Sequence, residues 1–215
     1  MTTGILDSDT GQTLRAVQDT PRHALAVLTD PDSPLLDAVV WLSAHLAAVE
    51  YVVRPEFRRC VDPDSVAQQL EGAVRIEHML RALEQQLTGD ALAAHIDPRQ
   101  MVRSVTQRLL EYIEQERRLL DVLRNRLTPE EQRHVAARYQ RALERGPTRP
   151  HPHAPHGRML GSLAYRVNGP RDRLMDTLDS RHVPTPHRPR PPVKTSRWGD
   201  YLLGASRASS GRDDR

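Results

Sequence analysis

Apolar residues recur at spacings of three and four along five stretches of the chain, a pattern that predicts amphipathic α-helices. The clearest stretch runs from Met101 to Leu127, in a helix that Asp97-Pro98 begins. Glu116 lies in the middle of its apolar face. Because burying a bare carboxylate costs on the order of several kcal/mol, we expect Glu116 to be paired, protonated or bound to a cation. The partner of Glu116 is therefore the first clue to function.

Two helices are predicted in the N-terminal part of the chain. The first covers Gln12 to Leu28 and contains Pro21, which removes a backbone donor and clashes with the preceding turn. We therefore expect a kinked helix, or one that restarts at Pro21 with Thr20 as its cap. The second helix runs from Pro34 to about Arg54, with Ser33 as its cap.

Polar side chains also lie on the apolar faces of the second and third helices. His45 falls inside the apolar face of the second helix, which Pro55 is expected to break or kink. The third helix runs between Asp62-Pro63 and Gly89. Glu77 lies on its apolar face, and His78 points about 100° further round, toward the rim or solvent.

A fifth helix and a proline-rich tail complete the chain. Thr128-Pro129-Glu130-Glu131 is typical of a capping box, so this helix begins there, and Gly146 stops it. The expected organisation is a flexible N-terminus over 1–11, a helical body over 12–146, a Pro/His-rich docking segment with short helices over 147–182, and a disordered basic tail over 183–215.

Charge and composition narrow the class of protein. The body up to Gly146 holds 22 Asp or Glu and 18 Arg and carries −4, whereas the remainder carries +7. Cys60 is the only cysteine, so a disulfide or a thiolate metal cluster within one chain is excluded. The acidic start has no signal-peptide pattern, and no apolar run approaches the roughly 18 residues of a membrane span. We therefore expect a soluble cytoplasmic protein with no membrane partner.

Four long amphipathic helices with short links bury their faces most simply as an up-down four-helix bundle. Three stretches resemble the hemerythrin-like (HHE cation-binding) family, particularly its actinobacterial type. They are Ser43-Ala44-His45 with Pro55 ten residues after the histidine, Leu109 to Leu120, and Leu127-Thr128-Pro129-Glu130-Glu131 leading into Pro147-Thr148-Arg149-Pro150-His151-Pro152. The resemblance covers about residues 12–152. It implies an all-α bundle of this type with an additional helix, and a site for non-haem iron, usually two irons held by histidines and carboxylates.

Part of the ligand set that the resemblance implies is present in this chain. His45, Glu77 and Glu116 match ligand positions, and Tyr112 stands where a histidine is usual. On the third helix a second alignment is open, in which His78 takes the ligand position in place of Glu77. One histidine and two carboxylates are also the composition of a facial triad that holds a single iron or manganese.

Other ligand positions of the family are changed. The first helix offers Gln18 as the nearest match to an inward histidine, while His23 projects the other way. On the second helix the family's glutamate is Val49, and Glu50 is one place off and faces away. Because about half of the ligands are missing, we expect no full di-iron centre and no cofactor, with non-haem iron as the alternative.

Tyr112 offers an explanation of Glu116 that needs no metal, because its hydroxyl can donate to the carboxylate. On that interpretation, replacing Glu116 with Leu should be neutral or stabilising. His151, His153 and His156 could bind nickel, zinc or copper, but docking of this segment across the end of the body is the favoured interpretation.

Three functions remain open. The favoured one is a non-catalytic structural or regulatory module with an eroded di-iron site and an unknown protein partner. The alternative is a non-haem iron protein that senses or handles oxygen, nitric oxide or peroxide. The third is a module that binds a partner or nucleic acid through its basic tail, although such charge runs are usually only solvated. Since no glycine-rich phosphate loop, nucleophile elbow or zinc spacing is present, we expect no enzyme.

Overall fold

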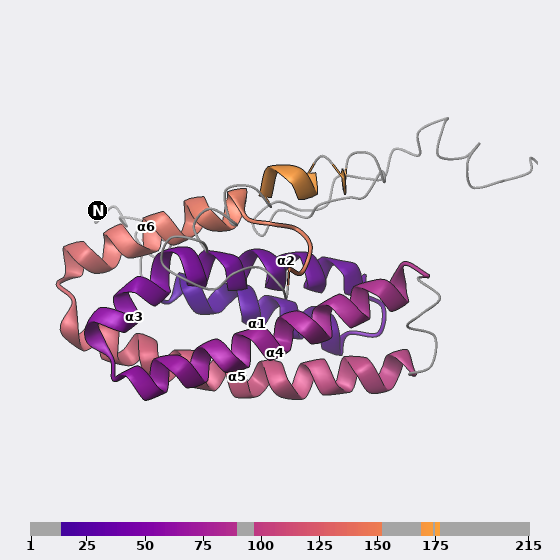
Figure 1. Cartoon of the computed structure of the whole chain (residues 1–215), viewed down its shortest axis with the longest axis horizontal. Helices are drawn as coiled ribbons and strands as arrows, with labels where there is room; N and C mark the ends of the chain where they lie inside the picture. Colours follow the sequence, from indigo (N-terminus) through magenta and orange to yellow (C-terminus); the bar gives the residue numbers. More distant parts are fainter. Residues whose placement is uncertain (1–13, 90–96, 152–168, 174, 177–215) are drawn as a thin grey trace, which may run out of the picture.

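The computed structural model describes residues 14–89, 97–151, 169–173, 175 and 176 of the 215-residue chain. All regular structure within these ranges is helical, which confirms the prediction of an all-α protein (Figure 1). The elements are α1 (Ala16–Thr29), α2 (Leu35–Ala48), a π-helical turn η2 (Val49–Val53), α3 (Arg54–Cys60), α4 (Pro63–Leu87), α5 (Pro98–Arg126) and α6 (Pro129–Arg145). The expectations for residues 1–11 and 183–215 lie outside the described residues.

Helix α1 runs through Pro21 without restarting there, so the prediction of Thr20 as a cap is wrong. Proline has no backbone N–H, and its position in the helix therefore leaves the carbonyl of Val17, four residues earlier, without its usual donor. The hydroxyl of Tyr139 in α6 lies 3.5 Å from this oxygen and donates to it. A side chain from another helix thus satisfies the backbone group that Pro21 frees.

Of the two outcomes expected at Pro55, a break or a kink, helix α2 does not break there, although a π-helical turn interrupts its regular pattern just before the proline. It continues through the π-turn into α3, and Pro55 occupies the first turn of α3, where a missing N–H costs least. A π-turn places residues five apart on one face, so it shifts the buried face relative to a regular α-helix. Glu50 consequently lies largely buried and does not face away, and Arg54 is almost completely buried.

The segment Leu35–Cys60 is long and apolar enough to span a membrane, with a mean hydropathy of 1.5 over its best window. The expectation that no run approaches that length is therefore corrected. Residues making up 72% of this window are buried inside the protein, which is the behaviour of a core helix.

Side-chain caps define the beginnings of three helices as predicted. The carboxylates of Asp62 and Asp97 accept from backbone N–H groups in the first turns of α4 and α5. Thr128 and Glu131 form the expected capping box of α6. Ser33, by contrast, does not cap α2, because its hydroxyl donates to the carboxylate of Asp30 at 2.6 Å.

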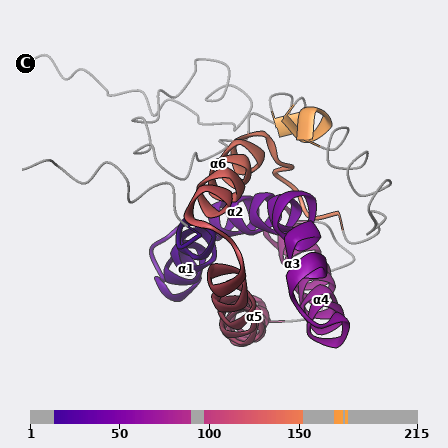
Figure 2. The same cartoon turned by 90° about the vertical axis from the view of Figure 1, so that its left-hand side faces the viewer.

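The long helices enclose a common core. Neighbouring contacts run from α1 to α2, from α2 to α4, from α4 to α5 and from α5 back to α1, while α6 packs on the outside against α2 (Figure 2). The core side chains are mainly Leu, Val, Ala and Ile, as the composition predicts, and Phe57 is fully buried. Helix α2 contacts helices on several sides and is buried around most of its circumference.

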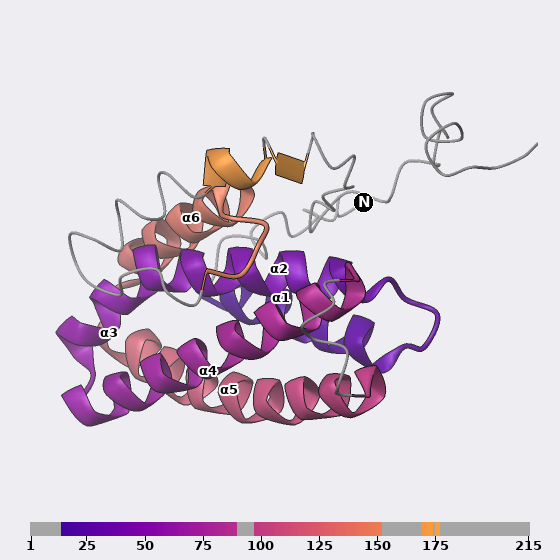
Figure 3. The same cartoon turned by 45° about the vertical axis from the view of Figure 1, so that its right-hand side comes forward.

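The segment after α6 docks back onto the body. Helical residues 169–173 lie over the C-terminal end of α6, where Arg173 donates to the carbonyl of Glu144 (Figure 3). Gly169 is required at this contact, since a Cβ atom there would lie 2.4 Å from the carbonyl oxygen of Arg145.

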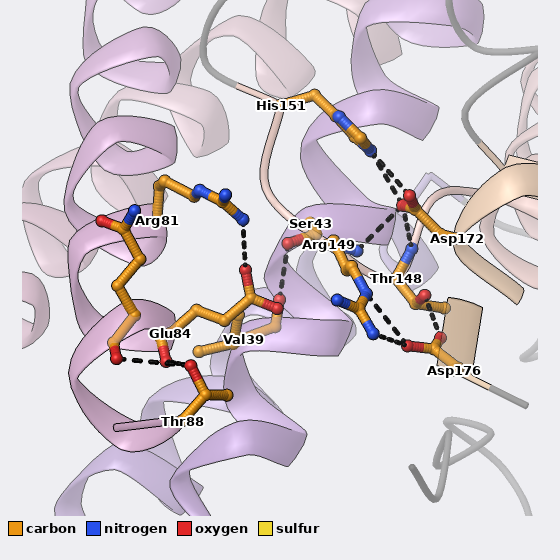
Figure 4. Close-up of polar contacts among 11 residues, drawn as sticks. Val39, Ser43, Arg81, Glu84, Thr88, Thr148, Arg149, His151, Asp172 and Asp176 are labelled. Atoms are coloured by element: carbon orange, nitrogen blue, oxygen red, sulfur yellow. Dashed lines mark hydrogen bonds and ion pairs between the residues drawn. The ribbon is translucent and has the colours of Figure 1, made fainter. Parts of the chain in front are cut away.

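Two buried aspartates hold this docked segment in place (Figure 4). Asp172 accepts from the backbone N–H groups of Thr148 and Arg149, both at 3.1 Å, and pairs with His151 at 2.9 Å. Asp176 accepts from the Thr148 hydroxyl and from Arg149 Nε at 3.2 Å. His151 thus has a structural partner, while His153 and His156 lie outside the described residues.

Candidate functional site

A layer of polar side chains divides the apolar core into two halves along the helix axes. On α2, α4 and α5 the apolar residues of one cluster give way to those of the other on either side of His45, Gln69 and Glu116. All three side chains are completely buried. We call this layer, together with Tyr112 and Tyr139, the central polar layer.

His45 and Glu116 form the middle of the central polar layer. The Nε2 atom of His45 lies 3.3 Å from Oε1 of Glu116, within ion-pair distance but outside hydrogen-bond geometry. On the other side of the ring, Nδ1 lies 2.8 Å from the hydroxyl of Tyr139. The imidazole is therefore held between a carboxylate of α5 and a phenol of α6.

Tyr112 and Gln69 extend the chain on the far side of the carboxylate. The Tyr112 hydroxyl donates to Glu116 Oε1 at 3.1 Å and accepts from Gln69 Nε2 at 2.8 Å. Burial, followed by the charge of Glu116, raises the pKa of Tyr112 well above its usual value. Burial likewise raises the pKa of Tyr139, so both phenols remain neutral donors.

The resulting chain of contacts joins five helices. It starts at the Val17 carbonyl in α1 and passes through Tyr139, His45, Glu116, Tyr112 and Gln69. Because each member has a directional partner on a different helix or turn, the chain fixes the register of the helices as well as satisfying buried polar groups. Three of its atoms are buried without a hydrogen-bond partner: Glu116 Oε2, His45 Nε2 and Gln69 Oε1.

A buried arginine forms a second polar cluster next to this layer. Arg54 is 1% exposed, and its Nε pairs with the carboxylate of Glu50. Arg58 also approaches Glu50, at 3.8 Å, but is itself 38% exposed. The positive charge of Arg54 acts on both Glu77 and Tyr112 and partly opposes the rise that burial causes in their pKa values. We call Glu50, Arg54 and Glu77 the Arg54 cluster.

Glu77 is the proton-binding member of the Arg54 cluster. Burial, followed by the negative charge of Glu50, raises the pKa of Glu77 to about 8, and the opposing effect of Arg54 is smaller. Glu77 is therefore mainly protonated at neutral pH, so the cluster avoids holding two negative charges against one positive charge.

The structure brings together three of the predicted site residues, His45, Tyr112 and Glu116, in one chain of contacts. Glu77 lies in the adjacent Arg54 cluster. His78 is exposed, whereas Glu77 at the neighbouring position is turned further toward the interior.

On the first helix, Gln18 faces the interior and His23 faces outward, as expected. Gln18 points inward and donates to the Ile113 carbonyl at 3.1 Å, while Arg22 donates to its side-chain oxygen. His23 is exposed and lies against the ring of Trp41, with ring centroids 4.2 Å apart.

The residues of the central polar layer do not fit the two-iron site that the resemblance implies. Within the described ranges, no group of three or more His, Cys, Asp or Glu side chains is placed to hold a metal ion. His45 and Glu116 face each other, and Tyr112 uses its proton on the same carboxylate oxygen. The nearby positive charge comes from a guanidinium, which cannot act as a metal ligand.

Three important residues were not identified from the sequence. Arg54 was placed at the end of a helix before a predicted break, and only the π-turn brings it inside. Gln69 and Tyr139 lie on buried faces and could have been found by the same helical spacing that identified Glu116. Their partners, however, depend on how the helices pack.

No family model, curated protein or solved structure matches this chain. The resemblance to hemerythrin-like proteins therefore rests on the residues and helix order described above. The function is argued below from the geometry of the central polar layer and the Arg54 cluster.

Proposed function

We propose that the chain is a hemerythrin-like, up-down four-helix bundle whose metal site has been replaced by protein side chains, and that it serves as a non-catalytic structural or regulatory module for a protein partner. In this arrangement α1, the α2–α3 segment, α4 and α5 are the four bundle helices, and α6 is the additional helix. The cyclic order of contacts among the four supports this topology.

The observation that carries the proposal is the burial of Arg54 beside Glu50 and Glu77. A bundle that gathers inward carboxylates needs a compensating positive charge. Here the positive charge is carried by a side chain of the protein itself, the guanidinium of Arg54. The hydroxyl of Tyr112 donates a hydrogen bond to Glu116. The interior is therefore stabilised without an exchangeable ion.

The second candidate function is binding of non-haem iron, and one atom favours it. Glu116 Oε2 is buried, has no hydrogen-bond partner and belongs to the residue that best matches a ligand position. A carboxylate oxygen of this kind is a suitable ligand for iron or manganese.

Replacing Glu116 with Leu distinguishes the two candidates. The change removes the acceptor of the Tyr112 hydroxyl and the carboxylate that faces His45 Nε2, so on this proposal we expect it to destabilise the protein rather than to be neutral or stabilising. We expect a loss of about 1–3 kcal/mol in the free energy of unfolding, equal in iron-free and iron-treated protein. Denaturant unfolding of both samples measures it.

Glu114→Leu provides the control on the same helix, since Glu114 is about half exposed and its ion pairs face solvent. Its effect should stay within about 1 kcal/mol. A loss for Glu116→Leu that occurs only in the iron-treated sample would support the iron protein and contradict the metal-free module.

A further inference from the structure

A cleft between η2 and α6 is lined by three arginines and one aromatic ring. Its volume is about 390 Å³, and its lining residues are Tyr51, Val52, Arg138, Arg141, Ala142, Arg145 and Pro170. None of these is acidic. A volume of this size falls in the range of small-molecule sites, in which an apolar surface and a few polar groups bind one ligand.

The three arginines share one side of α6. Positions 138, 141 and 145 are separated by three and four residues, so their side chains leave the helix in the same direction. The first and the last are seven positions apart, or about 10 Å along the helix. Three guanidinium groups thus follow one wall of the cleft, opposite Tyr51 and Val52 of η2.

These arginines differ from those of α4 and α5 in lacking carboxylate partners. Arg75, Arg108 and Arg118 line another cleft, but each pairs with a glutamate on its own helix. Within the described part of the chain, no hydrogen bond or ion pair involves the side chains of Arg138, Arg141 or Arg145. No carboxylate of the described residues therefore neutralises their positive charge.

The docked segment completes the cleft. Pro170 forms part of the lining, and the residues beside it are fixed by the close contact of Gly169 with Arg145. Asp172 and Asp176, which carry the negative charge of this segment, are both engaged by residues 148–151. The docked segment therefore forms one fixed side of the cleft, and its two carboxylates bind residues 148–151 instead of the arginines of the cleft.

We propose that this cleft binds a small phosphorylated ligand of nucleotide size, with the phosphates on Arg138, Arg141 and Arg145 and a ring system toward Tyr51 and Val52. The planar guanidinium group matches phosphate oxygens in a two-point hydrogen bond, which favours a phosphate over an isolated monovalent anion. The partly exposed ring of Tyr51 provides a surface for the less polar part of the ligand. The site lies on the outer side of α6 and does not depend on whether the interior holds a metal.

The test is calorimetric titration of the full chain with ADP, inorganic pyrophosphate and adenosine at low and moderate salt. We expect ADP to bind, pyrophosphate to bind more weakly and adenosine not to bind. Arg141→Gln should weaken ADP binding by about tenfold or more, because one two-point contact is lost. Tyr51→Leu should weaken ADP binding and leave pyrophosphate binding unchanged.

Arg133→Gln is the matched control, because Arg133 is an exposed arginine of α6 outside the cleft. It should change ADP affinity by less than twofold, and the melting temperatures of the two arginine variants should match that of the wild type. Absence of ADP binding, equal weakening by Arg133→Gln, or equal binding of adenosine would each overturn the proposal. Binding of single-stranded DNA without binding of ADP would also overturn it.

Discussion

Replacing Arg54 with Met is expected to lower the free energy of unfolding by about 3 kcal/mol. The substitution keeps much of the side-chain volume but leaves Glu50 in a largely buried position without its main partner. It also removes the positive charge that acts on Glu77 and Tyr112. Denaturant unfolding at pH 7, with the midpoint and slope compared to wild type, measures the effect.

Arg58→Met is the matched control, since Arg58 approaches the same carboxylate but is 38% exposed. Its effect should remain below about 1 kcal/mol. Adding Glu50→Gln to Arg54→Met should recover part of the lost stability, because the unpaired charge is then removed. Similar losses for Arg54→Met and Arg58→Met would show that burial of the guanidinium does not determine the stability of this core.

Replacing Glu77 with Gln is expected to stabilise the protein at pH 8 and to have little effect at pH 5. The pKa of Glu77 is raised to about 8 in the folded protein, above the ordinary value of 4.5. Between these values the folded state binds a proton that the unfolded state has lost, so folding is weakened as pH rises. Glutamine cannot ionise, and the variant should gain about 3 kcal/mol relative to wild type between pH 5 and pH 8.

Thermal or denaturant unfolding across this pH range, with both proteins in identical buffers, measures the difference. Glu71→Gln is the control on the same helix, because Glu71 is 61% exposed. Its stability difference from wild type should stay constant with pH. A constant difference for Glu77→Gln as well would mean that Glu77 is ionised in the folded state.

Much of the helical architecture follows directly from local sequence signals. The apolar spacing of α5 predicts its buried residues, including Tyr112 and Glu116, because a regular α-helix has a fixed periodicity. Aspartate or threonine followed by proline marks the beginnings of α4, α5 and α6. These signals act over a few residues and depend little on tertiary packing.

The wrong predictions concern prolines and polar residues whose effect on a helix depends on contacts with other helices or on a departure from regular helical periodicity. Pro21 lies inside a continuous helix because Tyr139 reaches the carbonyl that the proline leaves free. Pro55 follows a π-turn, which regular periodicity does not include. That turn moves Glu50 and Arg54 inward, and for this reason the cation beside the buried carboxylates was not predicted.

Several residues of the candidate site could be predicted from the sequence, but the hydrogen bonds and ion-pair contacts that join them could not. His45, Tyr112 and Glu116 were identified because polar residues are rare on apolar helix faces. Their pairing depends on side-chain direction and helix register, which bring Tyr139 and Gln69 into contact with them. The same three residue types can bind iron or bind one another, and only the arrangement distinguishes these outcomes.

The most direct test of the proposal that the interior holds no metal is the iron content of protein purified without oxygen from iron-supplied cells. Elemental analysis should find well below one iron per chain, with the same melting temperature before and after treatment with a chelator, because Arg54 and Tyr112 already stabilise the buried carboxylates. Iron in stoichiometric amount, lost in Glu116→Leu and accompanied by a lower melting temperature on chelation, would contradict the proposal.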